Sequence, residues 1–375
     1  MSGAGEGRPG GAGGNGRAGE DRLDALREEA RRTGSVEGRG VDVEGGPIPA
    51  GASGKPGGSG AAARAPAAVK GPQAAARAAD GDGPGYYGQP VVKPPVWTWE
   101  VPVYFFVGGL AGMSGVIAAA SRFMTGALDV AVPALWIAAL GAAASGLLLV
   151  RDLGRSSRFL NMLRVFKRRS PMSVGAWTLT GFGGASTAAL VLGSVQAHLA
   201  VSGGGSPALS VLLTIFLLAS GLLGAVLGTY TGVLIGATAI PAWFEHRLLL
   251  PAHFGIAGLG SAAALLQILG LGRPSLVAVA LAASGAECLV GLTVELDRHG
   301  AADRALREGG SGALLRLGGL LAGPAALVLW IVPVPIVASA VFLAGALVSR
   351  FGWLAAGRAS ARDPAATFAA QRMDA

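Results

Sequence analysis

The chain has 375 residues and a formal net charge of +8, with 51% hydrophobic but only 14% charged residues. About a quarter of the residues of a soluble domain are charged, so this composition and the mean hydropathy of +0.53 exclude an ordinary soluble domain. The basic residues lie in the first hundred residues and between apolar runs, without a nucleic-acid-binding motif, so nucleic acid is not an expected partner.

Residues 1–96 are rich in Gly, Ala, Pro and Arg and contain almost no large apolar side chains. This composition predicts a disordered tail. One charged segment, Glu20–Gly34, has the spacing of a short helix, but isolated helices of this length are marginal in water. The first residues, MSGAGEGRPGGAGG, lack the apolar core of a signal peptide.

The rest of the sequence is a succession of long apolar runs. A membrane-spanning helix needs about 20 such residues, and eight runs qualify: 101–121, 129–150, 174–196, 209–240, 252–271, 275–296, 313–332 and 334–350. The fold class expected is therefore all-α, a polytopic membrane domain over residues 97–352. A short polar tail over residues 353–375 follows it.

Charge is distributed unequally between the two ends of these spans. Eight spans place both termini on one side, and that side also receives the basic connection 151–173. The other side has little positive charge beyond Arg122 and Arg273. Because loops rich in Lys and Arg stay in the cytoplasm, we expect a multi-pass cell-membrane protein with both termini cytoplasmic.

Glycines recur every four residues along the fourth span, at Gly224, Gly228, Gly232 and Gly236. Small residues on one helix face let helix backbones approach closely in lipid. The spacing predicts a compact helix bundle rather than a wide pore.

Several kinds of redox and catalytic site are not indicated. Cys288 is the only cysteine, so the chain cannot hold an iron–sulfur cluster by its own thiolates. The four histidines fall near span ends or in loops, and no metal-ligand spacing, phosphate-binding loop or Ser–His–Asp order is evident. Any redox role would depend on electron carriers in a partner protein or on a diffusible molecule.

Few polar residues accompany the spans. Glu100 and Tyr104 are four residues apart and share a helix face, so they either belong to an interfacial belt or bind a lipid-soluble headgroup. Tyr230 lies within the glycine series and needs a partner for its hydroxyl, which a neighbouring carbonyl would also supply. Asp152 and Glu245 belong to the same half of the bundle, which predicts a small polar pocket there.

Three further acids are candidates for a proton route across the membrane. Glu287 falls in the middle of the sixth span, Glu295 falls near the cytoplasmic end of that span, and Asp129 begins the second span at the opposite face. Acids within the membrane are costly and often functional. A hydrogen bond between helices explains Glu287 equally well.

Three stretches of the sequence resemble the NrfD/PsrC family, the membrane subunits of polysulfide reductase-like complexes. They are WTWEVPVYFFVGGLAGMSG, DLGRSSRFLNMLRVFKRRSPMSVGAW and YTGVLIGATAIPAWFEHRLLLP. The resemblance covers residues 95–350 and implies two four-helix bundles, no haem or cluster in this chain, and a quinone near the first bundle, with menaquinone expected. The family's pocket uses polar residues of the first span and a tyrosine of the fourth, which correspond to the region around Glu100 and Tyr104 and to Tyr230.

The resemblance also implies two partners, a ferredoxin-like iron–sulfur subunit and a molybdopterin catalytic subunit. The leading hypothesis is therefore a quinone-interacting anchor that is not catalytic alone. The quinone site would comprise Glu100, Tyr104, Asp152, Tyr230 and Glu245. The iron–sulfur subunit would dock on Arg151, Arg155, Arg158, Asn161 and Arg164. A multi-pass transporter of a small solute or lipid and a purely structural anchor remain alternatives, which co-purified partners and bound quinone would separate.

Overall fold

The computed structural model describes residues 91–126, 128–152, 162–297, 300, 302–332 and 334–372, with side chains up to residue 368. Most of the predicted disordered tail and the helix candidate Glu20–Gly34 lie outside these residues. So do Arg155, Arg158 and Asn161 of the predicted docking surface. The described residues form helices and connections, without a strand among them.

The eight predicted spans are confirmed as eight helices long and apolar enough to cross a membrane. Seven are single helices: α3 (Glu100–Thr125), α4 (Ala131–Asp152), α6 (Pro171–Val201), α7 (Pro207–Gly236), α9 (Leu249–Ile268), α10 (Pro274–Leu296) and α14 (Pro335–Ala361). The seventh span in chain order, Gly309–Ile331, is made of α12 (Gly309–Leu320), η1 (Leu321–Ala325) and α13 (Ala326–Ile331). Three short helices lie outside the spans: α8 (Pro241–Glu245), α11 (Arg304–Arg307) and α15 (Pro364–Arg372).

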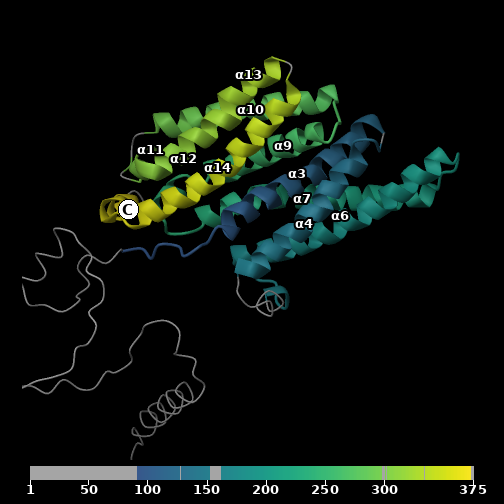
Figure 1. The fold of residues 1–375 in the computed structure, drawn as a ribbon. Coiled ribbons are helices and arrows are strands. Elements are labelled where there is room, and N and C mark those ends of the chain that lie inside the picture. The colour runs from purple at the N-terminus through teal and green to yellow at the C-terminus, as the bar shows by residue number, and fades with distance from the viewer. Residues whose placement is uncertain are drawn as a thin grey trace, which may run out of the picture. The chain divides into compact units, whose positions relative to one another are not determined.

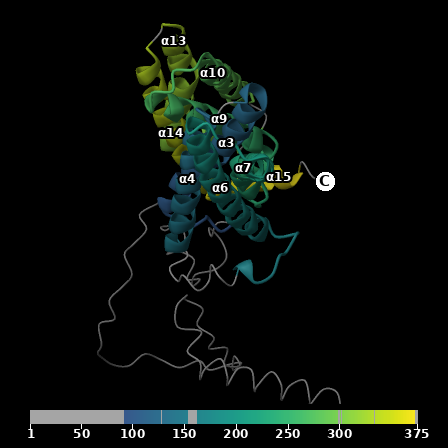
Figure 2. The same cartoon turned by 90° about the vertical axis from the view of Figure 1, so that its right-hand side faces the viewer.

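The spans pack as two four-helix bundles side by side (Figures 1 and 2). The first bundle contains α3, α4, α6 and α7, and the second contains α9, α10, the α12–α13 span and α14. Helix α9 packs against α3 and α7, and α14 also contacts α3, so these helices join the bundles. Such a pairing follows from the connections, because short loops place consecutive helices side by side.

Helix starts and stops agree with local sequence signals. Ser170 and Ser206 cap α6 and α7 by accepting the N–H groups of Ser173 and Leu209, and a proline follows each cap. Proline suits the first turn because its missing N–H would be unpaired there anyway. The seventh span is interrupted at Gly323, whose backbone is not helical and which precedes Pro324. Proline inside a helix removes a hydrogen bond and kinks the chain.

The glycine series of α7 packs against neighbouring backbone, as the four-residue spacing predicts. A Cβ at Gly224 would lie 2.2 Å from the carbonyl oxygen of Gly112 on α3, and one at Gly232 would lie 2.5 Å from the backbone of Leu250. These contacts bring α7 against α3 and against the start of α9. Only glycine permits such approaches.

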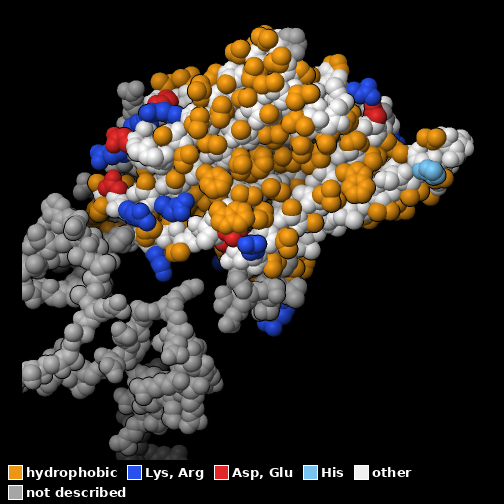
Figure 3. Space-filling view, viewed as in Figure 1, with side chains coloured by type: hydrophobic (Ala, Val, Ile, Leu, Met, Phe, Trp, Pro, Cys, Tyr) orange, Lys and Arg blue, Asp and Glu red, His pale blue; other side chains and the backbone are white. Residues whose placement is uncertain are grey.

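Charged side chains gather toward the two ends of the molecule, and apolar side chains cover the surface between them (Figure 3). The end formed by the start of α3 and the end of α14 carries exposed Arg151, Lys167, Arg168, Arg169, Arg247 and Arg362. At the other end the described cations are Arg122 and Arg273. The exposed apolar side chains between the ends identify the chain as an integral membrane protein.

Helix α14 differs from its prediction. The eighth span was expected to end at residue 350, where the first charged residue interrupts the apolar run, but α14 continues to Ala361. Arg350 is therefore inside a helix and 1% exposed. The helix continues past Arg350 because the guanidinium has buried partners on α9, so it does not need to reach water.

Candidate functional site

The first candidate site lies where α3 begins and α4 ends. Glu100 is the first residue of α3, and its Oε1 lies 3.5 Å from the Nε of Arg151 in the last turn of α4. Its other oxygen, Oε2, is buried and accepts no hydrogen bond. One side of this carboxylate therefore faces an exposed cation, and the other side faces the protein interior.

A cavity of about 40 Å³ adjoins Glu100, with walls from α3, α4, α6 and α7. Three of the five residues predicted to bind quinone line it, namely Glu100, Tyr104 and Asp152. The other lining residues are Trp97, Val101, Phe105, Leu148, Leu149, Met172 and Leu234. The polar groups thus lie on α3 and at the end of α4, in a mainly apolar surround.

The size of this cavity limits what it holds without rearrangement. Ligand pockets measure about 300–1,000 Å³, whereas 40 Å³ has room for a few water molecules. Entry of a quinone ring therefore requires a wall to move. Met172 is the candidate, because it is 55% exposed and its unbranched side chain adapts readily.

The end of α4 is also tied to the segment before α3. The hydroxyl of Thr98 donates a hydrogen bond of 3.3 Å to Oδ1 of Asp152, and the guanidinium of Arg151 lies 5.9 Å from the centre of the Trp99 ring. These contacts hold the mouth of the cavity between two segments that are far apart in sequence.

Tyr230 lies on α7 and does not line this cavity. Its hydroxyl donates a hydrogen bond of 2.7 Å to the carbonyl oxygen of Pro171, the first residue of α6. Its ring packs on Gly175, where a Cβ would lie 2.1 Å from the ring. The hydroxyl is therefore paired with backbone, and Leu234, one turn further along α7, reaches the cavity instead.

Glu245, the fifth predicted quinone residue, ends α8 and does not line the cavity beside Glu100. Its neighbours are Asp297 and Asp303, in the connection between α10 and α11 and at the start of α11. Partial burial, together with the charges of Asp303 and Asp297, raises the pKa of the Glu245 carboxyl to about 7. The residue belongs to a separate acidic cluster.

The three acids predicted as a proton route occupy three separate ion pairs. Asp129 pairs with Arg273 at the end opposite Glu100. Glu295 Oε1 lies 2.9 Å from the Nε of Arg316, and Glu287 Oε2 lies 3.1 Å from the Nδ1 of His253. No ion pair or hydrogen bond among the described residues links these acids to one another.

Glu287 is part of a buried polar chain in the second bundle that the sequence did not reveal. His253 on α9 lies between Glu287 on α10 and Arg350 on α14, with its Nε2 3.5 Å from a guanidinium nitrogen of Arg350. Arginine only donates hydrogen bonds, so Nε2 accepts, whereas the close contact between Nδ1 and Glu287 does not have the geometry of a hydrogen bond. Arg350 also donates to the carbonyl oxygen of Phe254 at 3.2 Å and lies 3.8 Å from the centre of its ring.

A cavity of about 410 Å³ adjoins this chain. His253, Glu287 and Ser349 contribute polar groups to its lining, and Leu292, Leu315 and Leu320 are among its apolar walls. One feature of the sequence could have indicated this buried polar chain. Arg350 lies inside ALVSRFGWLAAG, where apolar residues continue on both sides.

The described part of the predicted docking surface consists of Arg151 and Arg164, both exposed. Lys167, Arg168 and Arg169 extend it toward α6 and are also exposed. The backbone N–H of Lys167 donates to the Ser173 hydroxyl at 3.0 Å, and that hydroxyl donates to the Val165 carbonyl at 3.3 Å. The first turn of α6 thereby holds the end of the basic connection in place.

Comparison with protein families identifies the fold. The family described as polysulphide reductase, NrfD, matches residues 89–360, which include all eight spans up to the last turn of α14. Curated proteins give no match to the chain. Members of the matched family are membrane anchor subunits of molybdopterin oxidoreductase complexes. The chain, an integral membrane protein of eight apolar helices, belongs to the NrfD polysulphide reductase family.

Proposed function

We propose that this protein is the quinone-reactive membrane subunit of a molybdopterin and iron–sulfur oxidoreductase complex, with its Glu100 end in the cytoplasm. The observation that carries the proposal is the buried, unpaired Oε2 of Glu100 at an apolar cavity that also contains Tyr104. A hydroxyl of a quinol is the kind of donor that such an oxygen lacks. The apolar walls suit the ring, and menaquinone is the expected substrate.

The arrangement favours proton exchange at the membrane edge. Oxidation of a quinol releases two electrons and two protons, and a carboxylate in hydrogen-bond contact with the hydroxyl accepts one of these protons. The same carboxylate contacts Arg151, whose side chain is 71% exposed. A proton on Glu100 therefore has a short path to water. Asp152, which is exposed and lines the same cavity, offers a second acceptor.

Electrons would pass to or from a ferredoxin-like iron–sulfur subunit docked on the basic end. Exposed Arg151 contacts Glu100 at the cavity, and exposed Arg164, Lys167, Arg168 and Arg169 follow in the connection from α4 to α6. A positive surface attracts an acidic partner and fixes its orientation. The positive-inside rule supports the cytoplasmic assignment of this end.

The test is the Glu100→Gln variant in the intact complex. We expect quinol-linked turnover to fall by roughly 10²-fold, because the amide cannot accept the proton. Turnover with a water-soluble dye that delivers electrons directly to the iron–sulfur subunit should stay at the wild-type level. Both rates are measured on the same membranes, with the amount of assembled complex determined by immunoblot.

Glu308→Gln is the matched control, because Glu308 is exposed before α12 and does not line this cavity. It should preserve both rates. If Glu100→Gln retains wild-type quinol turnover, the site assignment is wrong. If in addition no variant of Tyr104 or Asp152 affects quinol turnover, a purely structural anchor becomes the better description.

A further inference from the structure

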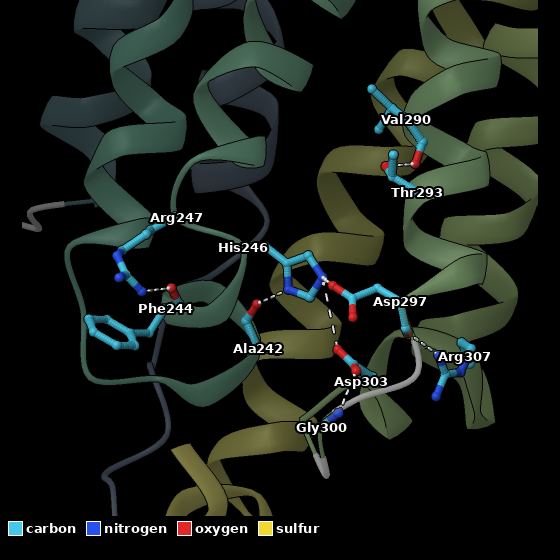
Figure 4. A network of polar contacts seen from close by, with 10 residues as sticks. All are labelled: Ala242, Phe244, His246, Arg247, Val290, Thr293, Asp297, Gly300, Asp303 and Arg307. Carbon is cyan, nitrogen blue, oxygen red and sulfur yellow. Dashed lines mark hydrogen bonds and ion pairs between the residues drawn. The ribbon is translucent and has the colours of Figure 1, made fainter. Parts of the chain in front are cut away.

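A cluster of potential metal ligands lies where the connection after α7 meets the connection after α10 (Figure 4). His246 follows α8, Asp297 follows α10, and Asp303 precedes α11. The Nε2 of His246 lies 3.9 Å from Oδ2 of Asp297 and 3.9 Å from Oδ1 of Asp303. All three ligand atoms lie within 4.8 Å of one another. The imidazole of His246 thus lies close to the carboxylates of two residues about fifty positions further along the sequence.

His246 has the environment of a metal-ligating histidine. Its Nδ1 lies 3.0 Å from the carbonyl oxygen of Ala242, which can only accept, so Nδ1 carries the hydrogen. The other ring nitrogen, Nε2, faces Asp297 and Asp303 (Figure 4). Histidines that bind metals use this same arrangement, with the second ring nitrogen donating to a carbonyl or carboxylate.

His246 is 5% exposed, yet its Nε2 has no hydrogen-bond partner. A buried polar atom without a partner carries a desolvation cost. The contact of Nδ1 with the Ala242 carbonyl orients the ring, which also packs 5.6 Å from the ring centre of Trp353. Rotation cannot easily bring Nε2 to another acceptor or donor, so the unpaired nitrogen points to a ligand at this position.

The carboxylate of Asp303 is also oriented by the backbone. Its Oδ2 accepts a hydrogen bond of 2.9 Å from the backbone N–H of Gly300, which leaves Oδ1 directed toward His246. Glu245 adds a third carboxylate nearby, because a Cβ at Gly300 would lie 2.8 Å from Glu245 Oε2. Glu245 Oε1 is buried and unpaired.

Asp303 and Glu245 bring two carboxylates to this cluster without a Lys or Arg partner among the described residues. Arg307 approaches the backbone carbonyl of Asp297. Partly buried carboxylates normally acquire a cation or a proton. A bound cation would relieve the mutual repulsion that the three acids generate.

We propose that His246, Asp297 and Asp303 bind a divalent first-row transition metal ion. Nitrogen and oxygen ligands of this kind suit Zn²⁺ and Mn²⁺. Ligand bonds of about 2.0–2.2 Å bring neighbouring donor atoms closer than the 3.9 Å observed, so binding draws the two acids slightly toward the ring.

The ion would fasten the connection between the two bundles to the connection that follows α10. His246 lies between α8 and α9, whereas Asp297 and Asp303 lie between α10 and α11. The site is therefore structural, and it is separate from the cavity beside Glu100. It stands independently of the proposed quinone reaction.

The test uses the tag-free full chain in detergent, freed of metal by a chelator and titrated with Zn²⁺ by calorimetry. We expect one ion per chain and a higher unfolding temperature with Zn²⁺. Asp303→Asn and His246→Gln should each weaken Zn²⁺ binding at least 10-fold, within the range seen for loss of a ligand or its support. The same titration with Mn²⁺ ranks the two metals.

His198→Gln and Glu308→Gln are the matched controls, because both residues are exposed and lie outside the cluster. They should bind Zn²⁺ like the wild type. Asp297→Asn provides a variant at an exposed ligand, so it tests the site even if a buried variant fails to fold. Absence of a stoichiometric Zn²⁺ or Mn²⁺ isotherm overturns the proposal, as does equal affinity in Asp303→Asn, Asp297→Asn and the controls.

Discussion

Gly224→Val is expected to prevent assembly of the first bundle. The new Cβ would lie 2.2 Å from the carbonyl oxygen of Gly112 and 3.1 Å from the carbon of that carbonyl. Both atoms belong to the backbone of α3, so no side-chain rotation relieves the clash. Overpacking costs about 1–3 kcal/mol even where side chains can shift, and separation of α7 from α3 would cost more.

The measurement is the yield of monodisperse protein after detergent extraction, followed by its unfolding temperature. Gly184→Val is the matched control, because a Cβ there meets no atom within 4 Å and the position is an exposed site in the middle of α6. It introduces the same β-branched residue into a transmembrane helix. Equal yield and stability for the two variants would contradict the proposed contact between α3 and α7.

The number of spans and the packing of the glycine series follow from the sequence because they depend on local properties. Hydropathy over about 20 residues determines whether a helix can span the bilayer, and a four-residue glycine spacing determines one helix face. The proximity of Glu100 and Tyr104 also follows from a local property, because residues four apart share a helix face. Asp152 joins them because alternating spans bring the end of α4 beside the start of α3.

Partners on distant helices were not predictable in this way. The hydroxyl of Tyr230 donates to a backbone carbonyl 59 residues away. Every residue has a backbone carbonyl, so residue types alone do not identify which one is the partner. His246 meets Asp303 only after α9 and α10 have packed. Glu245 shares the expected half of the bundle with Glu100, but its helix, α8, turns it toward the acidic cluster instead. Which side of a span end a residue faces depends on tertiary packing.

The environment of Arg350 likewise depends on partners from a distant helix. A cation at the end of an apolar run normally reaches the membrane surface, which placed the end of the eighth span at residue 350. Instead the guanidinium is buried in α14 and contacts His253 and the Phe254 carbonyl. Its charge offsets that of Glu287, which lies on the other side of His253 and is 2% exposed.

Arg350→Met is therefore expected to destabilise the second bundle by about 3–5 kcal/mol, the usual cost of leaving one buried charge without its partner. Methionine keeps a long apolar side chain, so the loss reports mainly on the charge. The measurement is reversible unfolding of the full chain in mixed micelles. Adding Glu287→Gln to Arg350→Met removes the remaining charge and should restore part of the lost stability.

Arg316→Met is the matched control for this prediction. Arg316 forms a direct ion pair with an acid of α10, Glu295, but its side chain is 58% exposed. Exposed pairs contribute about 0–1 kcal/mol, so the control should unfold close to the wild type. If Arg350→Met costs no more than Arg316→Met, the carboxylate of Glu287 is not held by a buried counter-charge. If the double variant is no more stable than Arg350→Met, charge is not what couples α10 to α14, and packing around Phe254 would account for the loss instead.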